Sequence, residues 1–378
     1  MFSIELESAC LLELLKSSLF SLSPNISTKA NWDRVYELAK AQGVVSLVAS
    51  SVPKDHRSEW LKVSFQNKAH YMQMLYEQNA LVSLFNMNHI PFVIIKGTAA
   101  AIYYPAPSLR TFGDIDFYIS ERYFKPSMDL LYNHGYKFVT NNYRQFEFKK
   151  NGVDIELHTK FSSKNYNDIE HILLEGLNNA VEYKISNSTF PGLPTYENGL
   201  VLLGHIMQHL KDSGIGLRQI VDWMMFVHNF LDDLTWEEHF RAFAIEAGLE
   251  KLAITVTYMC KKWIGLPDDI SWCNSADDSV ADQLLIQVLE DGNLGQDRAL
   301  YEIVKRSMKN EGTFNYLMRS GVDNWRLAQK HRVFRPFAWI YQICRYAFLG
   351  VSGLVKGRKI FKNDKQQSNL EELLNKLE

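Results

Sequence analysis

The chain has 378 residues, of which 46% are hydrophobic and 22% are charged, values typical of a folded globular protein. They exclude wholesale disorder, a collagen-like fibre and a small disulfide-stabilised scaffold. Lys and Arg number 41 against 43 Asp and Glu, and the net charge of −2 gives no general attraction toward nucleic acid. At roughly 150 residues per domain, the length predicts two or three structural units.

The N-terminal quarter of the chain predicts helices. Apolar residues recur at helical spacing over 8–20 and 32–50, and residues 57–89 predict one long helix whose apolar side includes Leu61 and Phe65. The first twenty residues lack the early basic residues of a secretory signal peptide, so we expect an amphipathic helix there.

The pattern changes after Pro91. The short β-branched run at 92–95 predicts a buried strand, and Thr98 is expected to cap a short helix over 99–104.

Two further stretches have the alternation of strands. Residues 114–120 predict a half-buried strand, and residues 121–134 are then expected to be helical. Within 146–158, two alternating runs are separated by Asn151-Gly152, a pair that favours a tight hairpin because both residues tolerate positive φ.

From about residue 195 onward the pattern is helical again. The predicted fold class is therefore α+β, with a small mixed β-sheet core flanked by helical regions. The predicted division is an N-terminal helical region at 1–88, an α+β core at 89–194 and a C-terminal helical region at 195–378.

Residues 337–355 form a strongly apolar stretch with basic residues on both sides. A buried or partner-binding helix is the favoured interpretation, and an interfacial helix on anionic lipid is the main alternative. A membrane span is disfavoured because the stretch is short and contains Gln342 and Arg345. The four scattered cysteines predict buried, reduced thiols, so we expect a cytoplasmic protein, with peripheral contact to the inner membrane face through 337–355 as the alternative.

Carboxylates gather on the predicted strands. Asp114 and Asp116 are two residues apart and so share one strand face, and Asp154, Glu156 and His158 share one face of the second hairpin strand. If these strands are neighbours, three carboxylates meet, and hard oxygen ligands suit Mg²⁺. Two metal ions held in this way are the clamp used for in-line phosphoryl transfer.

A strand-to-helix turn at Lys96-Gly97-Thr98 fits a phosphate ligand. Gly97 lets the backbone approach closely, and the N–H groups of the helix start and the Thr98 hydroxyl can donate to phosphate oxygens. Lys96 and Arg110 offer positive charge to the same phosphates.

A later helix carries further polar candidates. His205 and His209 have i, i+4 spacing, which is compatible with zinc but lacks a nearby Cys, so a role in lining the site is favoured. Arg218 is a candidate phosphate ligand, with Asp222 as its expected partner.

Together these motifs resemble the uncharacterised bacterial nucleotidyltransferase family of the DNA polymerase β-like nucleotidyltransferase superfamily. The resemblance covers residues 90–225 and rests on Ile95-Lys-Gly-Thr, Tyr104-Pro, Arg110, Gly113-Asp-Ile-Asp116 and Ile155-Glu-Leu-His158. It implies a small mixed sheet, two Mg²⁺ ions and transfer of a nucleoside monophosphate from an NTP.

The resemblance also implies roles for single residues. Asp114 and Asp116 resemble the metal-binding pair, and Gly97-Thr98 resembles the phosphate-binding turn. Glu156 resembles the third carboxylate, which helps to activate the acceptor hydroxyl, while Asp154 remains an alternative third ligand.

The expected partners are therefore an NTP and an acceptor that the sequence does not identify. A small-molecule acceptor is favoured, because the sequence displays no basic run that would serve tRNA or protein. A catalytically degenerate nucleotide sensor or scaffold is the alternative function. The sequence makes no prediction of the oligomeric state.

Overall fold

The computed structural model describes residues 4–141, 145–160, 169–212, 214–292, 312–325, 327–328, 331–345 and 364–378. Its strands are β1 (Phe92–Ile95), β2 (Asp114–Ile119), β3 (Lys137–Asn141), β4 (Gln145–Lys150), β5 (Val153–His158), β6 (Val181–Ile185) and β7 (Ser188–Gly192). Its α-helices are α1 (Leu6–Phe20), α2 (Trp32–Ala41), α3 (Val45–Val48), α4 (Ser58–Met87), α5 (Gly97–Ala101), α6 (Phe124–Asn133), α7 (Glu170–Asn178), α8 (Thr195–Asp212), α9 (Leu217–Phe230), α10 (Asp233–Thr235), α11 (Arg241–Glu246), α12 (Glu250–Met259), α13 (Asp278–Asp291), α15 (Thr313–Asn324) and α18 (Asp364–Leu377).

The strands form one mixed seven-stranded sheet in the order β3-β4-β5-β2-β1-β7-β6. β1 runs antiparallel to β2 and parallel to β7, while β2 runs parallel to β5. The α+β fold class predicted from the sequence is confirmed.

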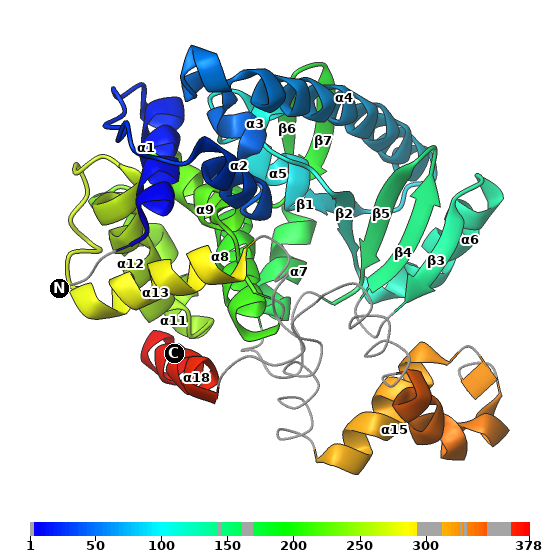
Figure 1. The fold of residues 1–378 in the computed structure, drawn as a ribbon. Helices are drawn as coiled ribbons and strands as arrows, with labels where there is room; N and C mark the ends of the chain where they lie inside the picture. Colours follow the sequence, from blue (N-terminus) through cyan, green and yellow to red (C-terminus); the bar gives the residue numbers. More distant parts are fainter. Residues whose placement is uncertain are drawn as a thin grey trace.

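Helices cover both faces of this sheet (Figure 1). On one face, α4 and α6 pack over apolar side chains of β1, β2 and β5, and Phe85 of α4 contacts Phe92 and Phe117. On the other face, Val93, Ile95 and the helices α5, α8 and α9 belong to the larger core, which also contains α1–α3 and α11–α13.

The predicted hairpin is present. β4 and β5 pair antiparallel, and Asn151 and Gly152 between them have φ values of 50° and 85°. The turn also contacts α4, because the Asn151 side chain donates to Glu77 and its carbonyl accepts from Gln73.

The long helix α4 is confirmed, but the expectation for its apolar side was wrong in part. Leu61, Phe65 and Tyr76 are exposed, Phe65 at 75%, whereas Tyr71 and Phe85 on another side of the helix are buried. The spacing of apolar residues could not show which side of α4 is buried, because apolar residues occur around much of the helix.

Three other local expectations need correction. The short helix α5 begins at Gly97, and Thr98 does not cap it with its side chain. The hairpin of β6 and β7 was not predicted, since Pro191 lies inside β7 and weakens its strand pattern. Cys344 is exposed, whereas the other three cysteines are buried as expected.

The C-terminal helix α18 packs against the larger core. It contacts α12 and α13 and buries Leu373, Leu374 and Leu377. Within 337–355, residues 338–345 are helical and 346–355 lie outside the described residues. No helix within the described ranges is long and apolar enough to cross a membrane.

The domain boundaries at 88 and 194 remain a prediction. The core that α4 shares with the sheet crosses the boundary at 88, and the larger core, which joins α1–α3 to α8 and α9, crosses both.

Candidate active site

The site begins at the turn between β1 and α5. Lys96 has φ 53° and ψ −138°, and Gly97 follows with φ 27°. A positive φ is uncommon for a residue with a side chain, so the chain holds Lys96 in a backbone conformation that favours glycine. The turn directs the Lys96 ammonium to the neighbouring strand, where Nζ donates to Asp116 Oδ1 over 2.9 Å.

The acidic residues come from β2 and β5. Their parallel register places Asp116 opposite Glu156 and Asp114 opposite Asp154. Since paired residues in a sheet project from the same face, all four carboxylates leave one face of the sheet. They differ in exposure: Asp116 is buried, Glu156 is mostly buried, and Asp154 is exposed and forms an ion pair with Lys149 over 2.9 Å.

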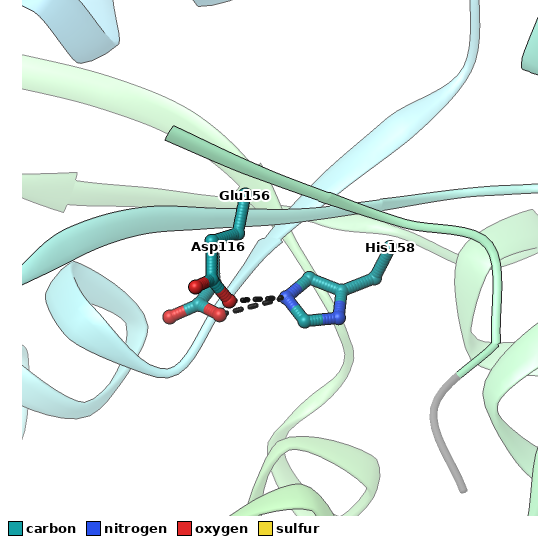
Figure 2. Close-up of side chains that lie close together, drawn as sticks. All are labelled: Asp116, Glu156 and His158. Atoms are coloured by element: carbon teal, nitrogen blue, oxygen red, sulfur yellow. Dashed lines mark hydrogen bonds and ion pairs between the residues drawn. The ribbon is translucent and has the colours of Figure 1, made fainter. Parts of the chain in front are cut away.

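Asp116, Glu156 and His158 meet in one cluster, as Figure 2 shows. His158 Nε2 lies 2.8 Å from Asp116 Oδ1 and 3.4 Å from Glu156 Oε2. One ligand atom from each of the three lies within 4.8 Å of the others, a spacing at which they could hold a metal ion. The sequence predicted both carboxylates for this role and placed His158 beside them.

The charges of the cluster shift its proton affinities. Burial acts to raise the pKa of Asp116, but Lys96 and His158 outweigh it and lower that pKa. Burial acts to lower the pKa of Lys96, and the negative charges of Asp116 and Glu156 outweigh it and raise the pKa. Burial and the positive charge of Lys96 act to lower the pKa of His158. The hydrogen bonds to Asp116 and Glu156 outweigh them, so the pKa of His158 is raised.

Asp114 lies on β2 near this cluster, and its pKa shifts in the opposite direction from that of Asp116. Burial is the main cause, and the nearby charges of Asp116 and Glu156 add to it, raising the pKa of Asp114 to about 7. Carboxylate oxygens are hard ligands that suit a divalent cation such as Mg²⁺.

The loop before β2 is fixed by a buried ion pair. Arg110 donates to both oxygens of Asp222 on α9, with Nε–Oδ1 and Nη2–Oδ2 distances of 2.7 Å. The Tyr104 hydroxyl also donates to Asp222 Oδ1 over 2.7 Å. Asp222, which the sequence paired with Arg218, therefore holds Arg110 in the structure.

The remaining candidates lie on the helical side of the site. Arg218 is half-buried, and its Nη1 donates to the Thr111 carbonyl over 3.2 Å. Burial and the positive charges of His209, Lys96 and Arg218 hold the pKa of His205 well below its usual value. His205 is therefore neutral, and its Nδ1 is buried without a hydrogen-bond partner among the described residues.

Thr98 points away from this face. Its hydroxyl is buried and donates to Gln78 Oε1 on α4 over 2.6 Å. The sequence gave no signal for Gln78, since a glutamine in a long helix is ordinary. The Tyr104 hydroxyl was also missed, although Tyr104-Pro was part of the resemblance.

No curated protein matches the chain. The crystal structure of an antigenic nucleotidyltransferase-like protein from Paracoccidioides brasiliensis is similar over 51% of this chain and 93% of that one, with 13% identity and a TM-score of 0.32. At this level, the likeness supports no conclusion about the fold or the activity.

The match of a family model is more extensive. It covers residues 28–265, and thus reaches beyond the motifs of 90–225 into the N-terminal helices and the helices after α9. The resemblance inferred from the sequence is confirmed: the chain belongs to the family of uncharacterised nucleotidyltransferases.

Proposed function

We propose that the protein is a Mg²⁺-dependent nucleotidyltransferase, which moves NMP from an NTP to an acceptor hydroxyl or phosphate and releases pyrophosphate. The register of β2 and β5 is the observation that carries this proposal, because it brings Asp114, Asp116 and Glu156 to one sheet face. Family membership supports the same class of reaction.

The carboxylates present suit Mg²⁺, because Asp114, Asp116 and Glu156 offer hard oxygen ligands from one sheet face, and we propose that two ions bind there. Asp114, Asp116 and Glu156 would hold them, and the ions would supply charge that neutralises the triphosphate and lowers the pKa of the acceptor hydroxyl.

The chain's own groups position the substrates and move the proton. The Lys96 ammonium and the Arg218 guanidinium are suited to orient phosphate oxygens, and backbone N–H groups at Gly97 can add to them. The Glu156 carboxylate accepts the acceptor's proton while the acceptor oxygen bonds to the α-phosphorus. The bond from that phosphorus to the bridging oxygen breaks, and pyrophosphate leaves with the electron pair.

A small molecule is the proposed acceptor. The near-neutral net charge supports this choice, because nucleic-acid enzymes usually present a basic surface to the phosphate backbone. Among the described residues near the site, Arg110 is buried and already holds Asp222, and Arg218 is half-buried.

The decisive experiment incubates the protein and Mg²⁺ with cell extract and NTPs labelled at the α- or the γ-phosphate. We expect label from the α position, and none from the γ position, to enter a small molecule. The Asp114→Asn, Asp116→Asn double variant should abolish incorporation, whereas Glu182→Gln, an exposed acid on β6, should not change it.

Other outcomes would count against the proposal. Turnover retained in the double variant would refute the carboxylate mechanism. Label in RNA or protein would refute the small-molecule acceptor. NTP binding without pyrophosphate release, across several divalent metals and extracts, would favour the degenerate sensor.

A further inference from the structure

The segment 331–345 carries an unusual outer surface. It begins with the 3-10 helix η7 (Arg332–Phe337) and continues as the helical residues 338–345. Apolar and basic side chains project from it together; we call them the apolar–basic surface. Its apolar members are Val333, Phe334, Phe337, Ile340 and Ile343, exposed at 77%, 37%, 54%, 43% and 45%, and its basic members are Arg332 and Arg335.

This exposure does not result from a lack of packing. The inner side of the segment rests on α15, where Trp339 packs against the buried Tyr316 and Leu317. A Cβ on Gly321 of α15 would lie 2.0 Å from the Ala338 carbonyl oxygen, so the two backbones are in close contact there. The segment therefore has a packed side and a separate apolar side that faces solvent.

The sequence around this segment carries charge of one sign only. Residues 325–363 contain no Asp or Glu, and all 43 acidic residues of the chain lie elsewhere. Since the whole chain is close to neutral, this basic stretch leaves the remainder with a net negative charge.

We propose that the apolar–basic surface binds the surface of an anionic lipid bilayer. Val333 and Phe337, the most exposed of these apolar side chains, can enter the boundary between headgroups and acyl chains, and Arg332 and Arg335 can meet the anionic headgroups. The negative remainder of the chain would be repelled by the same bilayer, which favours a single orientation. This proposal does not depend on the proposed nucleotidyl transfer.

The composition favours lipid over other partners. A nucleic acid would satisfy the arginines but leave five apolar side chains in water. A protein partner would need a matching hollow for each protruding side chain, whereas a fluid bilayer adapts to them.

Sedimentation of the full-length protein with vesicles tests the proposal. We expect it to pellet with vesicles of phosphatidylcholine and phosphatidylglycerol at low salt, and much less with phosphatidylcholine alone or at high salt. Arg332→Gln with Arg335→Gln should weaken this binding about 30-fold, and Phe334→Ser with Phe337→Ser should weaken it at least as much.

A matched control removes two exposed apolar side chains elsewhere. Leu61→Ser with Phe65→Ser on α4, exposed at 47% and 75%, should leave vesicle binding unchanged. The proposal fails if the protein stays in the supernatant with anionic vesicles, or if all three double variants bind alike. Two further results would also overturn it, if the protein does not bind vesicles. One is a dimer, detected by light scattering, that the Phe334→Ser, Phe337→Ser variant abolishes. The other is an RNA complex, detected by gel shift, that the same variant abolishes.

Discussion

Lys96 combines a strained backbone with a buried ion pair. Its φ of 53° would suit glycine, and such conformations cost about 1–3 kcal/mol for other residues. The ammonium that this backbone carries to Asp116 is the compensating feature. The strain thus places a positive charge at the base of the acidic cluster.

Two substitutions of Lys96 separate the effect of the strained backbone from the effect of the ammonium charge. Lys96→Gly relieves the strain and removes the charge, whereas Lys96→Met removes the charge and keeps the strain. We expect both to lower kcat about 100-fold or more, by the magnitude typical of lost electrostatic stabilisation. Urea unfolding should show the Gly variant as the more stable of the two; a Gly variant with unchanged kcat would exclude a role for the ammonium.

The third carboxylate can be identified by two neutral substitutions on β5. Glu156 lies in the cluster with Asp116 and His158, whereas Asp154 is exposed and bonded to Lys149. We therefore expect Glu156→Gln to lower kcat about 100-fold or more and Asp154→Asn to leave most of the activity. Steady-state rates of pyrophosphate release measure both, and the reverse order of effects would assign Asp154 as the ligand.

Asp114 makes stability depend on pH and on metal. Its pKa is about 7 in the folded protein and near 3.8 in an unfolded chain, so between these values the folded state binds more protons. Stability without metal should therefore fall as pH rises toward 7, and the raised pKa of His158 acts in the same direction.

Thermal unfolding in EDTA and in Mg²⁺ measures this effect. We expect Mg²⁺ to raise Tm more at pH 8 than at pH 6, because it binds the ionised carboxylate. Asp114→Asn should reduce both the decline of Tm with pH in EDTA and the gain from Mg²⁺. An equal increase of Tm by Mg²⁺ at both pH values would contradict a raised pKa for Asp114.

At the scale of elements, local patterns predicted the strands that carry the site. β1, β2 and the β4–β5 hairpin each have a short alternating or β-branched run bounded by turn residues. Their side-chain alternation then placed Asp114, Asp116, Glu156 and His158 on common faces. The parallel pairing of β2 with β5, which unites these faces, was only a condition in the sequence argument.

Contacts between distant elements could not be read from such patterns. Arg110 and Asp222 are 112 positions apart, and the loop before β2 has no period that reveals its partner. The sequence also did not predict which side of α4 is exposed, because burial depends on the elements against which the helix packs. Sequence motifs thus predicted which strand and face carry a residue, but not which distant side chain that residue contacts.

The Arg110–Asp222 pair predicts a large effect on stability. Asp222→Ala leaves a buried guanidinium and the Tyr104 hydroxyl without their acceptor, which should cost about 3–5 kcal/mol. The double variant Arg110→Met, Asp222→Leu should regain much of this loss, because the guanidinium that lost its acceptor is removed as well. Urea unfolding followed by tryptophan fluorescence tests both; a stable Asp222→Ala protein would contradict the buried pair.

At the scale of the whole molecule, α18 contributes to the larger hydrophobic core. Leu374 is 3% exposed within the helical layer of α12 and α13. Leu374→Ala should therefore lower the free energy of unfolding by about 2–5 kcal/mol. Asn375→Ala, an exposed neighbour, serves as the control, and equal stability of both variants would show that α18 does not pack as described.

The helix α4 links the two halves of the site. Gln78 accepts from Thr98 beside the β1–α5 turn, and Gln73 and Glu77 hold Asn151 at the start of β5. One helix of 30 residues, about 45 Å long, therefore braces both the proposed phosphate turn and the strand of Glu156. A fragment that starts at β1 would keep every proposed ligand but lose the helix that fixes their positions, so we expect the sheet alone not to preserve the candidate site.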